Sequence, residues 1–361
     1  RDSRMRELTS GNADVTAYYG ADAKGTHYYQ VAAPSPLDRT VCAVDVKGKV
    51  QTLSPSAGTS SAQFTPAMDM AVLSHSTVSC PPVYTLMSAA GKTLRTIEDN
   101  AAYAAAHASA PVKEFFQMTS DGHTLNGYVI KPARMQQGKK YPVIMSQYSG
   151  PGSQSVLNRW TYDWEQYYAT QGYVVVCVDG RGTGGRGREF SDVVYKRLGH
   201  YETIDQIAAA RYAASLPYAD ASRIGIYGWS YGGYEALMCA SADGAPYAAA
   251  VAVAPVTDWR YYDTVYAERY MLTPKQNAEG YRASAPLSRA SRLNCPLLMM
   301  SGTADDNVHL FNTMQYVSAL QSHGILCDMF LFPNMNHSIN GCNARAVVYA
   351  KMLEFFNAKL K

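Results

Sequence analysis

The pattern of hydrophobic and polar positions changes near residue 98 and divides the chain into two regions. In the first region, short apolar runs are separated by Gly, Pro, Asp and Ser, which is typical of β-strands joined by turns. We therefore expect residues 1–98 to form an all-β segment with the strand spacing of terminal β-propeller blades. Two blades are too few to close a ring, which takes about four to eight. The predicted strands are 15–19, 27–32, 41–46, 50–53, 70–75 and 83–88.

In the second region, residues 99–361, compact apolar runs alternate with helical periodicity. A helical patch at 101–108 and a hairpin at 113–132 come first. Buried strands that alternate with helices predict an α/β domain, a mainly parallel sheet with helices on both faces. Active sites on such sheets lie at the carboxyl ends of the strands. The predicted strands are 143–147, 173–178, 224–227, 249–254, 297–301 and 329–332, and the predicted helices are 201–216, 234–241, 310–323 and 344–360.

The composition and net charge exclude some classes of function but do not identify the function. The 361 residues are 47% hydrophobic and 17% charged, as expected for a chain with a sizeable core. A net charge of +3 gives no reason to expect nucleic acid or an anionic membrane as a partner. No apolar run approaches the ~20 residues of a membrane span. Seven cysteines without a CxxC pair predict no disulfide framework and no zinc site, and we expect most of them to be buried free thiols.

One stretch of the second region has the pattern of a nucleophilic serine. Residues 228–233 read Gly-Trp-Ser-Tyr-Gly-Gly, which matches G-x-S-x-G between a predicted strand and a predicted helix. A serine on such a sharp turn has a strained backbone, and small neighbours such as Gly228 and Gly232 let the chain pack around it. The start of the helix behind it favours developing negative charge. The pattern predicts an α/β-hydrolase fold with Ser230 as the nucleophile.

A serine nucleophile needs a base, and the base needs an orienting carboxylate. In α/β hydrolases the chain order is serine, acid, histidine. Asp305 and Asp306 follow the predicted strand 297–301, and His337 follows the strand 329–332, so all three lie at carboxyl ends of strands. We expect His337 to be the base. The spacing alone leaves both aspartates open as the acid.

Two competing interpretations of the motifs are weaker. Residues 180–185 satisfy G-x-G-x-x-G, but a dinucleotide site needs a helix directly after the motif. Residues 186–190 are a poor helix start, so we predict a loop. A metal site at Asp305 and Asp306 lacks a histidine pair at helical spacing, and HExxH is absent. No metal is therefore expected.

Several stretches of the chain resemble the prolyl oligopeptidase family. Val178-Asp179-Gly180-Arg181-Gly182-Thr183-Gly184, residues 197–199 and 228–233, and Thr303-Ala304-Asp305-Asp306-Asn307-Val308-His309 carry the likeness. Residues 253–271, which include Asp258-Trp259-Arg260-Tyr261-Tyr262-Asp263, resemble its dipeptidyl peptidase IV branch more narrowly. The likeness covers about residues 98–361 and, more weakly, 8–11 and 35–39 of the β-rich start.

The resemblance implies roles for individual residues. Asp305 matches the triad acid, and Ser230 and His337 match the nucleophile and the base. The oxyanion hole of the family pairs a backbone N–H, here that of Tyr231, with a tyrosine hydroxyl. That tyrosine is Tyr148, in the turn Tyr148-Ser149-Gly150-Pro151. No cofactor is implied.

The resemblance also implies an aromatic pocket for proline, a compact apolar residue without an N–H. Taken alone, an aromatic cluster such as Tyr261-Tyr262-Asp263-Thr264-Val265-Tyr266 is more often core. Asn307 matches a residue that helps to hold the carbonyl of the substrate backbone. The other expected substrate-binding residues are Trp229, Tyr231, Val256, Trp259, Tyr262, Tyr266 and Val308.

The sequence thus predicts a serine peptidase that cleaves after proline and releases Xaa-Pro dipeptides from free N-termini through an acyl-enzyme. Its partners would be peptides with proline at the penultimate position, and a homodimer is compatible with the resemblance. Fold does not fix substrate, so an acylaminoacyl peptidase or esterase is the alternative enzyme. The alternative outside enzymes is a non-catalytic interaction module.

Two departures from the branch bear on substrate and location. Nothing in residues 1–98 matches the pair of glutamates with which the branch holds the amine of its substrate. Ala249 lies where animal members carry a disulfide cysteine, which favours a bacterial relative that is exported, periplasmic or secreted. The chain opens with Arg1-Asp2-Ser3-Arg4, without Met or a signal peptide, as expected of a processed or truncated product.

Overall fold

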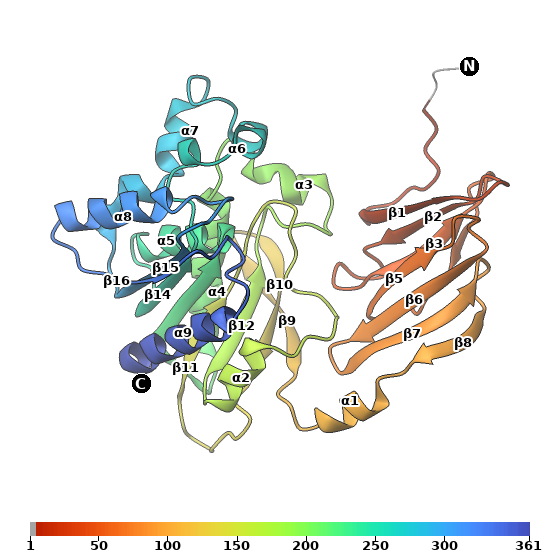
Figure 1. The fold of residues 1–361 in the computed structure, drawn as a ribbon, viewed down its shortest axis with the longest axis horizontal. Coiled ribbons are helices and arrows are strands. Elements are labelled where there is room, and N and C mark those ends of the chain that lie inside the picture. Colours follow the sequence, from red (N-terminus) through yellow and green to blue (C-terminus); the bar gives the residue numbers. More distant parts are fainter. Residues whose placement is uncertain (1–4) are drawn as a thin grey trace. The chain divides into compact units, whose positions relative to one another are not determined.

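The computed structural model describes residues 5–361, so the opening residues 1–4 lie outside the described part of the chain. The chain divides into two compact units, and Figure 1 draws its helices and strands. The first unit runs to Val112 and also includes Val156–Tyr162 and Gly184–Glu189. The second unit comprises Lys113–Ser155, Asp163–Thr183 and Phe190–Lys361.

The first unit contains two antiparallel sheets of four strands each, which confirms the predicted all-β segment. In each sheet the strands pair in chain order, as in a propeller blade. Tyr28, Val41, Leu73 and Met87 belong to the core that the two sheets share. A short helix, α1 (Ala101–Ala106), follows. One sheet holds β1 (Val15–Ala21), β2 (His27–Val31), β3 (Thr40–Val44) and β4 (Val50–Thr52), and the other β5 (Thr59–Phe64), β6 (Met70–Thr77), β7 (Cys80–Ser88) and β8 (Thr93–Glu98).

Strands β5 and β8 were not predicted from the sequence, for a physical reason. Strand β5 reads Thr-Ser-Ser-Ala-Gln-Phe and has few apolar residues to alternate. All six residues of β8 are exposed, so this edge strand has no buried face to mark it. Both strands are held by backbone pairing to their neighbours, which leaves little trace in the hydrophobic pattern.

The second unit is built on an eight-stranded sheet, which confirms the predicted α/β fold. The strand order is β16-β15-β14-β13-β11-β12-β10-β9, and the six strands from β11 to β16 run parallel. The hairpin predicted for 113–132 is formed by β9 and β10 and turns at residues 121–122. Strand β10 pairs antiparallel with β12. The strands are β9 (Lys113–Ser120), β10 (His123–Ile130), β11 (Tyr141–Ser146), β12 (Val174–Asp179), β13 (Ala219–Trp229), β14 (Ala249–Val253), β15 (Leu297–Gly302) and β16 (Asp328–Phe332).

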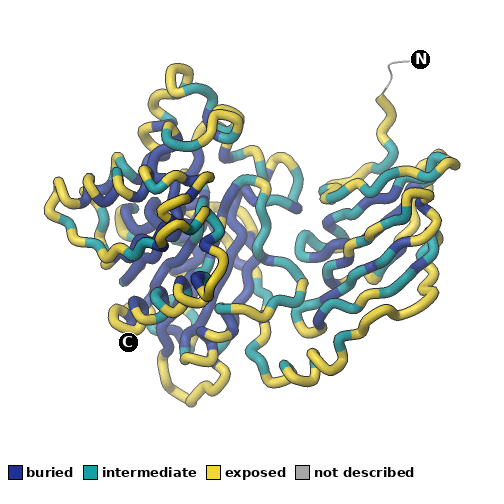
Figure 2. The backbone as a smooth tube through the Cα atoms, viewed as in Figure 1, coloured by how far each residue is buried: buried dark blue, intermediate teal, exposed yellow. Residues whose placement is uncertain are grey.

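Helices cover both faces of this sheet. Helices α4 (His200–Ser215), α5 (Tyr231–Ala240) and α8 (Phe311–Ser322) share one core cluster with the central strands. Helix α9 (Ala344–Leu360) packs on β13–β15, and the ring of Tyr349 on α9 stacks on Trp164 of α2 (Trp164–Thr170). Figure 2 shows the central strands as the buried part of the unit. The β-rich centre therefore has no solvent-facing side, which explains why its strands read as unbroken apolar runs.

Several short helices of the second unit did not show in the hydrophobic pattern. They are α2, α3 (Arg188–Ser191), α6 (Thr264–Met271) and α7 (Ala278–Ala283). The prediction that residues 186–190 make no helix start was wrong, since a single turn begins at Arg188. Phe190 packs into the core from this turn, and such packing can override a weak local preference.

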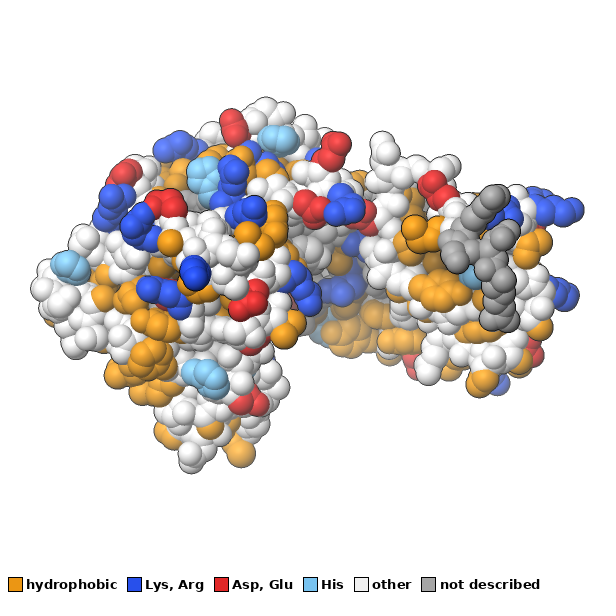
Figure 3. Space-filling view, turned by 90° about the horizontal axis from the view of Figure 1, so that it is seen from above, with side chains coloured by type: hydrophobic (Ala, Val, Ile, Leu, Met, Phe, Trp, Pro, Cys, Tyr) orange, Lys and Arg blue, Asp and Glu red, His pale blue; other side chains and the backbone are white. Residues whose placement is uncertain are grey.

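The surface charges follow the near-neutral composition, whereas the burial of the cysteines differs from the expectation. Figure 3 shows basic and acidic side chains interspersed over the face that it draws. All seven cysteines are free thiols, but only Cys42, Cys177 and Cys239 are buried, so the prediction that most of them are buried was wrong. Within residues 5–361, no helix has the length and apolar character needed to cross a membrane.

Candidate active site

Ser230 lies on a sharp turn between a strand and a helix. Strand β13 ends at Trp229, helix α5 begins at Tyr231, and Ser230 between them has φ 60° and ψ −118°. A residue other than glycine at positive φ costs about 1–3 kcal/mol, so the surrounding structure must hold it there. The N–H of Ser230 donates to the carbonyl of Val253 at the end of β14, at 2.8 Å. The side chain is therefore presented at the carboxyl edge of the sheet.

The glycines of the motif are required by close backbone contacts. A Cβ on Gly228 would lie 2.0 Å from the carbonyl oxygen of Gly232. A Cβ on Gly232 would lie 2.5 Å from the carbonyl oxygen of Gln147. Neither contact can be relieved by a side-chain rotation, because both partners are backbone atoms. The two glycines thus allow the tight turn that presents Ser230.

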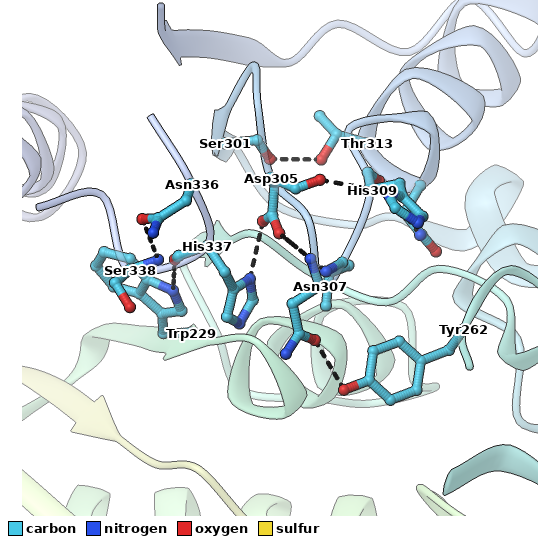
Figure 4. A network of polar contacts seen from close by, with 12 residues as sticks. Trp229, Tyr262, Ser301, Asp305, Asn307, His309, Thr313, Asn336, His337 and Ser338 are labelled. Carbon is cyan, nitrogen blue, oxygen red and sulfur yellow. Dashed lines mark hydrogen bonds and ion pairs between the residues drawn. The ribbon is translucent and has the colours of Figure 1, made fainter. Parts of the chain in front are cut away.

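Asp305 and His337 are brought together by the loops after β15 and β16. Nδ1 of His337 lies 2.8 Å from Oδ2 of Asp305, as Figure 4 shows. The other carboxylate oxygen of Asp305 accepts the N–H groups of Asn307 and Val308 at 3.0 and 2.9 Å. Asp306 is exposed, so the contact with His337 falls to the first of the two aspartates. A carboxylate fixed in this way can orient the imidazole and leave its Nε2 for a reacting group.

Trp229 connects the serine turn to the histidine loop. Its indole N–H donates to the carbonyl of His337 at 3.1 Å, and the Arg345 guanidinium lies 4.3 Å from its ring centre. The structure therefore places Trp229 beside the histidine loop and not with the aromatic residues expected to bind substrate. Since Trp229 precedes Ser230 directly, this bond keeps Ser230 and His337 on neighbouring segments.

Tyr148 lies beside Ser230 at the end of β11. Burial raises the pKa of its phenol, while a hydrogen bond with the Ser230 side chain lowers it. Tyr148 is 40% exposed. Its ring centre lies 6.1 Å from that of Tyr231. A Cβ on Gly150 would lie 2.5 Å from the Tyr148 ring, so this glycine leaves room for the ring. The phenol remains a proton donor throughout the neutral pH range.

Polar neighbours of Tyr148, which were not predicted from the sequence, hold its turn. The amide of Gln147 donates to the carbonyl of Gly232 at 2.7 Å, which ties the end of β11 to the start of α5. Ser149 has φ 62°, and its hydroxyl donates to Gln147 and accepts from Gln206. These buried contacts fix the turn that carries the phenol.

The backbone N–H of Tyr231 is the second expected donor. Tyr231 is the first residue of α5, and the first N–H groups of a helix have no acceptor within the helix. The positive end of the helix dipole lies at the same point. This N–H and the phenol of Tyr148 are both hydrogen-bond donors that lie next to Ser230.

Aromatic residues from three segments meet beside this turn. The Trp259 ring centre lies 5.5 Å from that of Tyr231, 5.7 Å from Tyr266 and 6.0 Å from Tyr262. Val256 and Val308 are buried in the same cluster. Tyr262 and Tyr266 are only half-buried, so their rings are the accessible part. We call Tyr231, Val256, Trp259, Tyr262, Tyr266 and Val308 the aromatic cluster.

Asn307 joins the aromatic cluster to the aspartate loop. The hydroxyl of Tyr262 donates to Oδ1 of Asn307 at 2.8 Å (Figure 4). This bond orients the amide, so that its NH₂ group is the side available to a carbonyl. The structure thus brings Ser230, Tyr148, Asn307 and the aromatic cluster to one edge of the sheet.

Residues 180–185 do not form a dinucleotide site. Arg181 is 2% exposed, and its guanidinium contacts the Asp205 carboxylate at 2.8–3.2 Å through Nε and Nη2. A Cβ on Gly182 would lie 2.6 Å from the Val194 side chain. The loop is therefore closed by its own contacts. In the described part of the chain, no group of three or more His, Cys, Asp or Glu could hold a metal ion.

Two buried glutamates behind the aromatic cluster were not predicted. Glu202 on α4 and Glu235 on α5 are both fully buried. The hydroxyl of Tyr231 donates to Oε1 of Glu202 at 2.7 Å. Burial raises the pKa of Glu202 from 4.5 to about 7, and the bond from Tyr231 lowers it in part. Burial also raises the pKa of Glu235 well above its ordinary range.

This raised pKa predicts how Glu202→Gln alters stability with pH. Between about pH 4.5 and 7, folded Glu202 keeps a proton that the unfolded chain releases, so stability falls as pH rises. The full effect corresponds to about 3 kcal/mol. Glu202→Gln should therefore melt higher relative to wild type at pH 8 than at pH 5, by a few degrees. Calorimetry at both pH values measures this, with exposed Asp306→Asn as the control. Equal differences at both pH values would contradict it.

Comparisons with known proteins agree with this geometry. The sequence profile of the prolyl oligopeptidase family matches residues 160–361, and that of the dipeptidyl peptidase IV N-terminal region matches residues 1–82. The probable dipeptidyl-aminopeptidase B of Paracoccidioides brasiliensis is 38% identical over 369 residues, which cover 96% of this chain and 40% of that protein. The homologue of the same name from Ajellomyces capsulatus strain H88 is 46% identical over 248 residues, 67% of this chain and 27% of that protein.

Solved structures give the same result. The crystal structure of Porphyromonas gingivalis dipeptidyl peptidase 4 superposes with a TM-score of 0.95 and 46% identity, covering 99% of this chain and 51% of that one. The chain spans about 40% of the length of the fungal relative from Paracoccidioides brasiliensis and about half of the crystallised protein. Since the family profile matches more than half of the chain, the protein belongs to the prolyl oligopeptidase family.

Proposed function

We propose that the protein is a serine peptidase that cleaves after proline and releases Xaa-Pro dipeptides from free N-termini of peptides. The observation that carries the proposal is the strained turn at Ser230, beside the hydrogen-bonded pair of Asp305 and His337. The Tyr148 phenol forms a hydrogen bond with the side chain of this serine. The names of the relatives, dipeptidyl-aminopeptidase B and dipeptidyl peptidase 4, support the same class of reaction.

In the proposed acylation step, Oγ of Ser230 attacks the carbonyl carbon of the scissile bond and its proton passes to Nε2 of His337. The carbonyl oxygen becomes negative and accepts hydrogen bonds from the Tyr148 phenol and the Tyr231 N–H. When the C–N bond breaks, His337 returns the proton to the leaving amine. The carboxylate of Asp305 stabilises the imidazolium between these two transfers.

In the deacylation step, water attacks the acyl carbon and gives a proton to His337. The ester bond to Ser230 then breaks, and His337 returns the proton to Oγ. The reaction consumes one water and yields a dipeptide acid and the shortened peptide. All proton transfers use residues of the chain, so the proposal needs no metal or cofactor.

We propose that the aromatic cluster is the binding surface for proline and call it the proline pocket. Proline is compact and apolar and has no N–H to satisfy, so flat rings suit it better than polar groups. The half-buried rings of Tyr262 and Tyr266 offer this surface next to Ser230. The Asn307 amide would hold the carbonyl that precedes the proline.

A panel of p-nitroanilides tests this proposal. We expect the kcat/KM of the protein for Gly-Pro-p-nitroanilide to exceed that for Gly-Leu-p-nitroanilide by at least about tenfold, because a pocket shaped for a compact ring discriminates by about 1–3 kcal/mol. p-Nitrophenyl butyrate is the control for an esterase. A preference for the ester or for Gly-Leu would overturn the proline assignment, and no hydrolysis would favour a non-catalytic module.

The requirement for a free amine rests on the resemblance alone. Residues 1–98 contain no match to the glutamate pair that holds the amine in the branch. Without that contact, which is worth about ten- to a hundredfold in kcat/KM, the protein should hydrolyse Gly-Pro and acetyl-Gly-Pro amides with kcat/KM values within about tenfold of each other. If it instead prefers the free amine strongly, an acid of this chain must hold the amine, and Glu268 is the first to test.

We further propose that the protein is exported, periplasmic or secreted, and forms a homodimer. Export follows from the resemblance described above. For the dimer, Phe311 and Met314 on α8, Leu326 and Met329 at β16, and Val347 on α9 are large apolar side chains exposed on the second unit. Cell fractionation tests export, and sedimentation of the wild type against a Phe311→Glu variant tests the dimer.

A further inference from the structure

Glu202 lies one hydrogen bond behind the residue that joins the two halves of the proposed site. Tyr231 contributes its N–H beside Ser230 and its ring to the aromatic cluster, and its hydroxyl donates to Oε1 of Glu202 at 2.7 Å. Glu202 is the third residue of α4 and has no exposed surface. The tyrosine ring is therefore held at two points, by its backbone at the start of α5 and by its hydroxyl at α4.

Glu235 places a second carboxyl group next to this bond. It lies one turn after Tyr231 on α5, and its Oε1 accepts from the hydroxyl of Thr203 at 2.8 Å and from the thiol of Cys239 at 3.2 Å. Oε2 of Glu202 and Oε2 of Glu235 are both buried without a hydrogen-bond partner among residues 5–361. A buried carboxylate oxygen without a donor is costly, which disfavours two negative charges at this point.

The other ionisable groups around the pair do not neutralise it. Asp205 on α4 is fully engaged with Arg181. Arg289 lies on the 3₁₀ helix Pro286–Arg292. It lowers the pKa of Glu235 less than the hydrogen bonds from Thr203 and Cys239 do. The remaining groups that face the pair are neutral phenols and a thiol: Tyr231, Tyr234, Cys239, Tyr247 and Tyr266. Burial of both carboxyl groups therefore disfavours a second charge, and the phenol donor favours Glu202 as the group that carries the first.

We propose that Glu202 is a positioning residue for the proline pocket, whose carboxylate holds the Tyr231 ring by its hydroxyl while Glu235 keeps the pair to a single negative charge. This inference rests on the proposed function, because it takes the Tyr231 ring as a wall of the pocket. A carboxylate accepts a phenol more strongly than a neutral acceptor does. Loss of that charge therefore loosens the ring and weakens substrate binding, without touching the triad or the backbone donor.

A double-mutant cycle on Tyr231→Phe and Glu202→Gln tests the inference, with KM for Gly-Pro-p-nitroanilide as the readout. Each single variant should raise KM about three- to tenfold with kcat unchanged, as expected when ground-state and transition-state binding weaken equally. Because Glu202 acts through the hydroxyl, the double variant should be no worse than Tyr231→Phe alone. The control is Tyr128→Phe, which removes a buried hydroxyl that donates to the Glu165 carboxylate, outside the cluster, and should leave KM unchanged.

A pH series on the wild type supplies a second readout, with Glu202→Gln as its control. Protonation of Glu202 turns it into a neutral acceptor, so KM should rise as pH falls from 8 to 6, and this rise should be absent in Glu202→Gln. Effects that multiply in the double variant, or a KM of the wild type that does not change with pH, would overturn the inference. Labelling by an active-site phosphonylating reagent separates the two claims. A labelled protein without preference for proline means that the proposed function has failed, whereas a preference with unchanged KM in both variants refutes the role of Glu202 only.

Discussion

Replacement of Ser230 by alanine is expected to lower kcat for Gly-Pro-p-nitroanilide by about 10⁴- to 10⁶-fold, as triad losses do in serine proteases. The reason is that the hydroxyl forms the covalent bond, and no neighbouring group can replace it at φ 60° on the turn. Steady-state kinetics with Gly-Pro-p-nitroanilide, whose product absorbs strongly, measure the loss of kcat. The fold should persist, since the backbone bond from Ser230 to Val253 does not involve the side chain.

The matched control for this variant is Ser241→Ala. Ser241 lies at the other end of α5, and its hydroxyl donates to the carbonyl of Leu237 inside the protein. Its loss should leave kcat within about threefold and cost about 1 kcal/mol in stability. A Ser230→Ala protein that keeps more than about a tenth of the wild-type rate would show that another group is the nucleophile.

Replacement of Tyr148 by phenylalanine is expected to lower kcat by about 10²- to 10³-fold with little change in KM, the cost of one oxyanion donor. The phenol acts on charge that develops only in the transition state, so it adds little to substrate binding. Because burial raises the pKa of Tyr148, the donor should persist at alkaline pH, and kcat should not fall there through loss of its proton.

Tyr167→Phe is the control for Tyr148→Phe, because Tyr167 is an exposed tyrosine on α2 in the same unit. Steady-state parameters for both variants, measured from pH 6 to 10, separate the possible roles. An unchanged kcat together with a raised KM in Tyr148→Phe would mean that the ring only packs against substrate. In that case the Tyr231 N–H would be the sole proposed donor left.

The parts of the site that could be predicted from the sequence are those in which the reaction requires particular residues next to one another in the chain. Gly228 and Gly232 follow from the tight turn around a serine, and the backbone contacts at both positions show why no larger residue fits. The spacing left two aspartates open, and only the folded loop distinguishes them. Asp305 accepts two backbone N–H groups and contacts His337, whereas Asp306 points to solvent.

What could not be predicted depends on contacts between segments far apart in the chain. Glu202 and Tyr231 are bonded through the packing of α4 on α5, and no local pattern marks that pair. The role of Gln147 in tying β11 to Gly232 is of the same kind. Trp229 was expected among the substrate-binding residues. Its side chain instead turns to the histidine loop, since the residue before the nucleophile points to the other side of the turn.

The short helices of the second unit also could not be predicted from the hydrophobic pattern. Helix α6 begins at Thr264 with the Asp263 side chain capping it, which is a recognisable start signal. Only two of its eight residues are buried, so hydrophobic periodicity does not reveal it. Its position matters because Tyr266 on this helix packs on Trp259 in the aromatic cluster. Local capping signals would have found the helix, but not its contacts.

The most direct test of the central claim is covalent labelling with a diphenyl phosphonate analogue of Gly-Pro, compared with its Gly-Leu counterpart. The reagent needs an activated serine to react and a pocket for its proline to react quickly. We predict one label per chain, located on Ser230 by peptide mass spectrometry, with a second-order rate constant at least about tenfold higher for Gly-Pro than for Gly-Leu. A label on any other residue, or equal rates for the two reagents, would contradict a serine peptidase that cleaves after proline.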